Sequence, residues 1–287
     1  MLSLQSPAKI NFFLRILRKR PDGYHDLASL FQAIDLCDTM HFDLAENDAF
    51  TCSDPSLPTD ATNLVSKARD LFRKKTGIKH CFSINLHKKI PQHAGLGGGS
   101  SNAATTLWAL NNLCGKKATD KQLSDWGAEI GSDIPFFLSQ GTAYCTGRGE
   151  ILRGLAPLEN QTIWIVKPPI GLSTQRVYGQ LDIKDSNPEY VAKQILELES
   201  ILPEFALSQR TKDETIYFND LEEPAFKLAP QLGALKQKLE GYGFSSVLMS
   251  GSGSSFFCVG GKDLLLNIPD CQTFKCQHIN RDHSRWY

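Results

Sequence analysis

The sequence predicts an α+β protein built in two halves. Its 287 residues are enough for one large domain or two modest ones. In each half, strand-like segments come first and helix-like segments follow, an order that is typical of α+β architecture. A polar stretch that contains a proline, residues 156–161, separates the two halves. We therefore expect an N-terminal domain over residues 1–157 and a C-terminal domain over residues 158–287.

The first half opens with the clearest strand pattern. Apolar side chains occupy every second position at Ile10, Phe12, Leu14 and Ile16, which predicts a strand over residues 4–17. The other elements expected in this half are strands at residues 27–36, 39–44 and 81–90, helices at 63–77 and from about 100 to 113, a short helix after a capping box at 119–122, a short apolar segment at 134–138 and a hairpin at 142–152.

The second half has the same order with shorter strands. A strand is expected at residues 163–166, and it leads into a helix that begins near Thr174. Further helices are expected at 189–201 and 229–241, and short strands at 247–249 and 256–259. No motif is recognisable in the last 25 residues.

Composition excludes several classes of protein. Lys and Arg together number 31, as do Asp and Glu, so the chain lacks the basic excess of a general nucleic-acid binder. No run of 18 apolar residues is present, and polar residues interrupt the apolar N-terminus, so neither a membrane span nor a signal peptide is expected. The eight cysteines form no CxxC pair and the histidines no HExxH motif. We expect a cytoplasmic protein with reduced cysteines and no protein-built metal site.

The most informative segment is a glycine-rich loop that precedes a predicted helix. Four of the five residues at positions 95–99 are glycine, and Ser100 and Ser101 follow. Glycines let backbone N–H groups converge on one point, and the first N–H groups of a helix have no internal partner, so together they favour a phosphate. A flexible turn before a helix is the alternative. A Walker loop would need a lysine, a dinucleotide loop would need Gly or Ala where Ser100 stands, and the protein-kinase HRD and DFG motifs are absent.

Four motifs together resemble one kinase superfamily. The string PxxxGLGGGSSNAA at residues 91–104 resembles the phosphate-binding motif of the galactokinase, homoserine kinase, mevalonate kinase and phosphomevalonate kinase (GHMP) superfamily. Matching segments occur, in the same order, at residues 6–14 with PDGYH at 21–25, at 131–137 and at 250–255. The family loop often has glycine where His93 stands, and the late motif usually has a threonine near Ser252. These departures imply an altered nucleotide affinity.

The resemblance implies a fold and a nucleotide site. The fold would be the two-domain GHMP kinase fold, with an N-terminal domain like the second domain of ribosomal protein S5 and a ferredoxin-like C-terminal domain. ATP would bind between them, with Asn63 and Lys88 near its adenine or ribose. Mg²⁺ is expected with ATP, although no protein ligand for it is identified. The loop residues implied to hold ATP are Pro91, Gln92, His93, Ala94, Gly95, Leu96, Gly97, Gly98, Gly99, Ser100 and Ser101.

Two charged residues are candidates for the chemistry. Asp133 stands among apolar neighbours, which suits either a catalytic base or a cap for the helix that follows. Lys9 lies inside an apolar strand, where a lysine either pairs with another group or reaches solvent along its stem. The resemblance implies that Asp133 is the base of a phosphoryl transfer and that Lys9 stands beside it.

The remaining candidates concern the substrate. The form of the loop and the PDGYH segment are most similar to those superfamily members whose substrate is a cytidine diphosphate sugar alcohol. The residues that this resemblance places at the substrate are Asn11, Tyr24, His25, Thr174, Tyr178, Gly251 and Gly253. Asn11 faces the same side of its strand as Lys9, and a strand-edge amide is its alternative role. Core packing explains Tyr178 equally well.

The sequence allows three alternative functions to be compared with this one. Another small-molecule GHMP kinase, such as a homoserine or mevalonate kinase, would not need PDGYH. A catalytically idle nucleotide-binding protein would not need both Lys9 and Asp133. A dinucleotide oxidoreductase lacks the required loop glycine and an acidic residue at a suitable distance. We thus expect ATP and a small molecule as partners, with no nucleic acid and no membrane, and the oligomeric state stays open.

Overall fold

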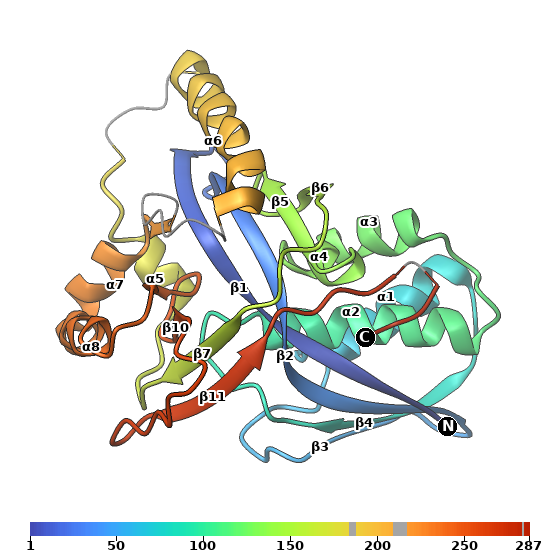
Figure 1. Ribbon diagram of the computed structural model, residues 1–287. Coiled ribbons are helices and arrows are strands. Elements are labelled where there is room, and N and C mark those ends of the chain that lie inside the picture. Colours follow the sequence, from blue (N-terminus) through green and yellow to red (C-terminus); the bar gives the residue numbers. More distant parts are fainter. Residues whose placement is uncertain (184–187, 209–216, 283) are drawn as a thin grey trace.

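A computed structural model describes residues 1–183, 188–208, 217–282 and 284–287. The first sheet is built on a long antiparallel pair, β1 (Leu2–Lys19) and β2 (His25–Ala45) (Figure 1). β4 (Cys81–His87) and β3 (Ala49–Cys52) continue the sheet beyond β2, and β8 (Phe218–Asn219) pairs with β1 on the other side. The hairpin of β5 (Thr142–Thr146) and β6 (Ile151–Gly154) also pairs with β2.

β2 differs from the expectation of two strands. It is one strand, because its pairing with β1 continues across a bulge, where Pro7 lies opposite Cys37 and Ala8 opposite Ile34. β4 pairs with β2 only from Thr39 onward, whereas β5 pairs with its earlier part. The edge of β2 between these two partners is therefore free to receive other segments of the chain.

Four helices cover one face of the first sheet: α1 (Leu64–Thr76), α2 (Gly98–Leu113), α3 (Asp120–Ile130) and α4 (Ile134–Leu138). α1 has the expected ends, because Asn63 caps its first turn and Gly77 closes it in the left-handed conformation. The predicted capping box at Thr119 and Gln122 opens α3. α2 begins at Gly98, two residues before the expected position, so the last glycines belong to the helix itself.

The second sheet has four antiparallel strands among the described residues. In the order of the sheet they are β11 (Gln272–Gln277), β7 (Thr162–Lys167), β10 (Phe256–Val259) and β9 (Ser246–Met249). Numbered along the chain this order is 4-1-3-2, the order of a ferredoxin-like sheet, although residues 260–271 connect its last two strands without a helix. The helices of this half are α5 (Thr174–Tyr178), α6 (Pro188–Ser208), α7 (Glu222–Leu228) and α8 (Pro230–Glu240). Neither α7 nor β11 was expected from the sequence.

Successive side chains of β1 point alternately to the two faces of the sheet. Ala8, Ile10 and Phe12 face the second sheet and pack with residues such as Ile165 and Phe257. Lys9 and Asn11 point to the opposite face of β1, the side of the helices. A third core lies between the second sheet and α5, α7 and α8. No described helix has the length and apolar character needed to cross a membrane.

The last residues return to the first half after β11. His278 forms an isolated bridge with Ile34, and the Trp286 indole N–H donates to the Gln5 carbonyl oxygen at 2.7 Å. Figure 1 shows this segment, in red, crossing from β11 to the side of the molecule where α1 and α2 lie. The division of the chain at residues 157 and 158 stays a prediction.

The two halves meet where the glycine-rich loop touches the turn at residues 250–254. The Ser255 N–H donates to the Ala94 carbonyl oxygen at 3.1 Å, and the Ser250 hydroxyl donates to the Gly95 carbonyl oxygen at 3.1 Å. A β-carbon added at Gly95 would stand 1.9 Å from the Ser250 carbonyl oxygen. Only glycine allows the two backbones to approach this closely.

This contact predicts a large loss of stability for Gly95→Ala. Gly115→Ala is a matched control, because the φ angles are +74° at Gly95 and +77° at Gly115, and nothing lies within 4 Å of a β-carbon at Gly115. The left-handed strain should cost each variant about 1 kcal/mol. The clash should cost Gly95→Ala at least about 2 kcal/mol more in the free energy of unfolding. Urea denaturation of both variants measures the difference, and equal losses would contradict the close approach.

Candidate active site

The glycine-rich loop is fixed at its apolar residues and open at its glycines. Ala94 and Leu96 are buried, and the Lys9 backbone N–H donates to the Leu96 carbonyl oxygen at 2.9 Å. Gly97 then turns the chain with a φ of +70° and is the N-cap of α2, without a side chain to cap the helix. The first N–H groups of α2 thus have no partner within the helix, which leaves donors suited to an anion.

A buried polar network holds the base of this loop. The Asp38 carboxylate is fully buried and accepts from four donors: the Lys88 ammonium, the backbone N–H groups of Lys89 and Ile90, and the Asn102 side-chain amide. Lys88 and Asp38 form an ion pair that is almost wholly inaccessible to solvent. Since Asn102 lies on α2 and the other donors precede the loop, Asp38 ties the two ends of the loop together.

Ser101 belongs to the same network. The Ser6 hydroxyl donates to the Ser101 Oγ at 2.8 Å, and the Asn102 amide donates to the Ser6 Oγ at 2.9 Å. The Ser101 N–H donates to the Gly97 carbonyl oxygen within the helix. Of the two serines expected to hold ATP, Ser100 is therefore the partly exposed one, whereas Ser101 is buried behind the loop.

Lys9 is a buried ammonium at the centre of the site. Only 3% of the residue is exposed. Its Nζ donates to the Asn11 Oδ1 at 2.6 Å and lies 5.0 Å from the centre of the Phe31 ring. Burial lowers the pKa of Lys9, while the negative charge of Asp133 acts to raise it. Lys9 and Asp133, 124 positions apart in the sequence, therefore interact as charges in the fold.

Asp133 occupies the N-cap position of α4 but does not cap it. Its side chain makes no capping hydrogen bond with the helix, so the expected alternative of a structural cap does not describe it. The Asp133 Oδ1 lies 3.6 Å from the position of a β-carbon at Gly149. Its charge also contributes, after burial, to raising the pKa of the Tyr178 hydroxyl and the pKa of the Cys145 thiol. The carboxylate thus faces Lys9, Cys145 and Tyr178.

The PDGYH segment and α5 meet on one side of Asp133. The rings of His25 and Tyr178 are 5.1 Å apart between centroids, which is a direct contact. Tyr24 is 54% exposed, and the Arg148 guanidinium lies 4.9 Å from the centre of its ring. Burial, followed by the charge of Lys19, lowers the pKa of His25, which favours its neutral form. Of the residues expected at the substrate, His25 and Tyr178 are in contact, and Tyr24 directly precedes His25. We call these three residues the aromatic cluster.

The late glycine turn completes the surroundings of Lys9. A β-carbon added at Gly251 would lie 3.2 Å from the Lys9 Nζ and 3.5 Å from the Asn11 Oδ1. The Asn219 amide holds this turn by donating to the carbonyl oxygens of Met249 and Gly251, both at 2.8 Å. Gly251 consequently gives the turn its close approach to the ammonium.

Thr174 contacts the same turn from α5, and Gly253 lies within the turn. The hydroxyls of Thr174 and Ser252 are 2.9 Å apart, so the start of α5 is joined to the turn. Gly253 faces Met249, whose sulfur would be 2.6 Å from an added β-carbon. Gly253 therefore makes room within the turn, while Gly251 makes room for Lys9.

Three residues that were expected to bind ATP lie around the loop, but their polar groups have other partners or lie away from its glycines. His93 is exposed, and its side chain lies beside Gly171, with its Cβ 3.3 Å from the position of a β-carbon there. The Asn63 side chain accepts from the Val65 N–H as the cap of α1. The Lys88 ammonium is paired with Asp38, although it stands beside Gly98. Their roles toward ATP stay predictions.

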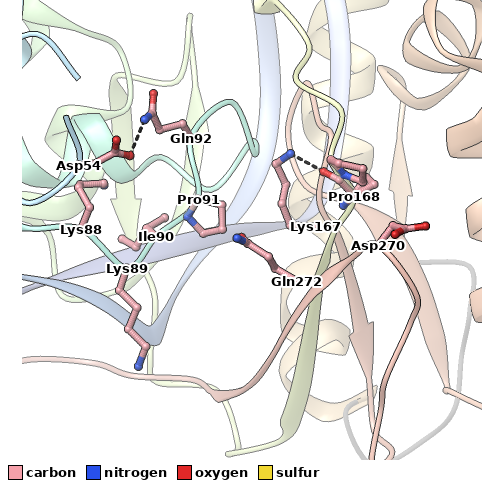
Figure 2. Close-up of a pocket in the computed structure, with 11 residues that line it drawn as sticks. Asp54, Lys88, Lys89, Ile90, Pro91, Gln92, Lys167, Pro168, Asp270 and Gln272 are labelled. Carbon is pink, nitrogen blue, oxygen red and sulfur yellow. Dashed lines mark hydrogen bonds between the residues drawn. The ribbon is translucent and has the colours of Figure 1, made fainter. Parts of the chain in front are cut away.

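A cavity opens at the beginning of the loop, between the two halves (Figure 2). Its volume is about 460 Å³. The first half contributes Asp54 and residues 88–92, and the second half contributes residues 167–169 with Asp270 and Gln272. Figure 2 shows the Gln92 amide directed at Asp54, with which it forms a hydrogen bond of 2.7 Å. The cavity is therefore a largely polar space that adjoins the first residues of the predicted phosphate loop, Pro91 and Gln92.

Several residues of the site gave no sequence signal. Asp38, Asn219, Cys145 and Arg148 stand in no motif, and only the fold brings them to the loop, the late turn or the PDGYH segment. For Asp38, an acidic residue between two apolar strand segments was the available hint. The sequence placed it between two predicted strands, and the structure places it opposite Ser6, just beyond the bulge of β2.

Comparison with known proteins defines the class first. Residues 63–141 match the family described as "GHMP kinases N terminal domain", and residues 191–268 match "GHMP kinases C terminal". The solved structure of a homoserine kinase from Cytophaga hutchinsonii has the same fold, with a TM-score of 0.72 over 98% of this chain and 96% of that one, at 18% identity. Fold and site together are those of a small-molecule kinase of the GHMP type.

More similar proteins narrow this class. The 4-diphosphocytidyl-2-C-methyl-D-erythritol kinase of Protochlamydia amoebophila is 50% identical over all of this chain and 93% of its own length. The chloroplastic kinase of the same name from Oryza sativa is 44% identical over all of this chain and 73% of its own. A crystal structure of 4-(cytidine 5′-diphospho)-2C-methyl-D-erythritol kinase superposes with a TM-score of 0.77 at 30% identity, over 97% of this chain and 99% of that one. The chain belongs to the 4-diphosphocytidyl-2-C-methyl-D-erythritol kinase family.

The charge interaction at the centre of the site predicts how Lys9 titrates. Because burial lowers its pKa, Lys9 should lose its proton below the ordinary lysine value of 10.5 as the pH rises. Asp133→Asn removes the negative charge that opposes this shift, so the pKa of Lys9 should fall further. NMR titration of the Lys9 ε-carbon measures both values. Asp125→Asn is the control, since Asp125 is exposed and pairs with Lys121. An unchanged Lys9 titration in Asp133→Asn would contradict the interaction.

Proposed function

We propose that this protein transfers the γ-phosphoryl group of ATP to the 2-hydroxyl of 4-diphosphocytidyl-2-C-methyl-D-erythritol, in the non-mevalonate (methylerythritol phosphate) isoprenoid pathway. The names and identities of its relatives support the substrate. The observation that carries the chemistry is the buried Lys9 ammonium in charge interaction with Asp133, next to the glycine-rich loop. The products are the 2-phosphate and ADP.

In this proposal Asp133 is the general base. It accepts the proton of the 2-hydroxyl while the hydroxyl oxygen forms a bond to the γ-phosphorus and the bond from that phosphorus to the β-phosphate oxygen breaks. Lys9 keeps the carboxylate ionised and stabilises negative charge on the attacking oxygen and the phosphoryl oxygens. Asn11 orients the Lys9 ammonium through their hydrogen bond of 2.6 Å.

The loop and the cavity suit the two ends of ATP. The phosphates lie against the N–H groups at the start of α2, with the Ser100 hydroxyl as a further donor. The cavity that begins at Pro91 and Gln92 receives the adenosine end. Leu64 lies 3.5 Å from the position of a β-carbon at Gly99, so the start of α1 borders the same side of the loop.

Mg²⁺ accompanies ATP in this proposal. When bound, it neutralises charge on the phosphate oxygens. The described residues contain no group of three His, Cys, Asp or Glu side chains that would hold a metal ion. This donor set suits a metal held mainly by phosphate oxygens and water.

The aromatic cluster is the proposed cytosine site. Tyr24 offers an exposed ring for stacking, and the neutral His25 ring offers one donor and one acceptor to the edge of a base. Tyr178, whose ring contacts His25, is proposed to stack on the face of the base opposite Tyr24. A homoserine or mevalonate kinase, the alternative within the superfamily, would have no use for this cluster. A cytoplasmic location completes the proposal.

Substrate preference tests the assignment. ADP release should be fast with 4-diphosphocytidyl-2-C-methyl-D-erythritol and near background with homoserine or mevalonate, because only the first carries a cytosine for Tyr24 and His25. A coupled assay at equal concentrations of the three compounds measures this. If the cytidyl compound gave no advantage, the specific assignment would be lost while the kinase class would stand.

The base assignment predicts a loss of turnover without a loss of nucleotide. Asp133→Asn should lower kcat by about a hundredfold or more, since an amide cannot accept the hydroxyl proton. ATP affinity, measured by isothermal titration calorimetry, should change little. The exposed Asp125→Asn serves as control and should keep wild-type turnover. Near-normal kcat in Asp133→Asn would overturn the role of Asp133.

A further inference from the structure

The segment after β11 contacts the stretch of chain that follows α4. We call residues 278–282 and 284–287 the C-terminal strap. The Ile279 N–H donates to the Ala33 carbonyl oxygen at 3.0 Å, on the edge of β2 that β4 and β5 leave free. The Asn280 amide donates to the Gln140 carbonyl oxygen at 2.9 Å and to the Thr142 hydroxyl at 2.8 Å. The strap is thus hydrogen-bonded both to β2 and to the residues that follow α4.

Arg281 makes the most telling contacts of the strap. Its Nε donates to the Ser139 carbonyl oxygen at 2.8 Å, and its Nη2 donates to the Leu138 carbonyl oxygen. These two carbonyls are at the C-terminal end of α4, where a helix has no internal donors for them. Arg281 is only 7% exposed, and its Nη1 donates to the Arg285 carbonyl oxygen at 3.3 Å.

This arrangement is unusual for a buried guanidinium. A buried charge is costly unless hydrogen bonds or an opposite charge compensate it. Arg281 donates to backbone carbonyls, and the ring centres of Trp286 and Tyr287 lie 4.8 and 5.9 Å from its central carbon. Burial lowers the pKa of Arg281, while the charges of Asp120 and Asp282 act to raise it. Two of the hydrogen bonds that offset its burial are made to the end of α4, and α4 is held in return.

α4 connects this contact to the active site. Its five residues, Ile134–Leu138, are all buried, and Asp133 directly precedes them. The Phe137 ring lies 2.9 Å from the position of a β-carbon at Gly97, the N-cap of α2. The Phe136 ring packs edge-on against Phe31, above which the Lys9 ammonium lies. A helix of this length, about 8 Å, moves as one body in a close-packed core.

We propose that Arg281 is a positioning residue for the phosphoryl transfer: by holding the carbonyl oxygens of Leu138 and Ser139 it fixes α4, and thereby the carboxylate of Asp133. The inference rests on the proposed role of Asp133 as the base. It assigns a function in the reaction to a segment of the chain in which the sequence shows no motif.

The test compares substitutions at Arg281 with two controls on the same strap. Arg281→Ala should lower kcat about ten- to a hundredfold while KM for ATP changes by less than about threefold, because a small displacement of the base affects the chemical step and not the nucleotide loop. Arg281→Lys, which keeps the charge but cannot span two carbonyls, should fall between. Added guanidinium should restore part of the kcat of Arg281→Ala.

The controls separate positioning from general stability. Arg285→Ala changes an exposed side chain and should leave kcat and stability unchanged. Trp286→Phe removes the indole donor to Gln5 but keeps an aromatic ring beside the Arg281 guanidinium, so it should lower the thermal midpoint while kcat stays unchanged. If Arg281→Ala does not fold, the kcat of Arg281→Lys is compared with that of Trp286→Phe instead. A kcat in both Arg281 variants equal to that of Trp286→Phe would overturn the proposal.

A double substitution separates this inference from the proposed function. In an Asp133→Asn background, Arg281→Ala should have little further effect on the residual rate, because the group it positions is gone. Hydrogen exchange of the α4 amides should be faster in Arg281→Ala than in wild type. Two results would contradict the role of Arg281 and leave the kinase assignment intact. One is that Arg281→Ala lowers the rate by the same factor in the Asp133→Asn background as in wild type. The other is that hydrogen exchange of the α4 amides is unchanged in Arg281→Ala. Normal turnover in Asp133→Asn alone would instead sink the function of Asp133.

Discussion

The site depends on one constraint: the amino group of Lys9 is buried, and a carboxylate must offset the cost of its positive charge. Burial works against the charge of Lys9, and the carboxylate of Asp133 works for it. The two residues come from the beginning of the chain and from the turn before α4, so neither is in place until the first sheet and its helices have assembled. Asn11 gives the ammonium a neutral acceptor, and the late turn comes within contact distance only because residue 251 is glycine.

The glycines of the loop have separate physical tasks. Gly95 lets two backbones touch where the halves of the molecule meet, and Gly97 reverses the chain into α2 against the Phe137 ring. Asp38 holds both ends of the loop through one buried carboxylate, so the strands, the loop and α2 move together. The donors offered to an anion are thus fixed before any nucleotide arrives, which is the preorganisation that electrostatic catalysis requires.

Local patterns in the sequence predicted much of this architecture. Period-two alternation identified β1, and Asn63, Thr119 and Gly77 marked helix ends, because caps and alternation depend on neighbouring residues. The bulge that joins β2 into one strand, the strand β11 and the C-terminal strap depend on partners far away in the chain, and no local pattern announces them. Lys9 and Asp133 were recognised through family motifs, whereas Asp38 and Arg281 act on backbone groups and leave no motif. The roles assigned to individual site residues stay predictions.

The central claim is that a buried ammonium and a carboxylate prepare an alcohol to attack a phosphate held by the start of α2. A crystal structure with a non-hydrolysable ATP analogue and 4-diphosphocytidyl-2-C-methyl-D-erythritol tests it most directly. The account predicts the 2-hydroxyl oxygen within about 3.2 Å of the Asp133 carboxylate. It also predicts the Lys9 ammonium on the same side and the phosphates against the N–H groups of residues 98–100. A hydroxyl far from Asp133, or phosphates away from the glycines, would contradict it.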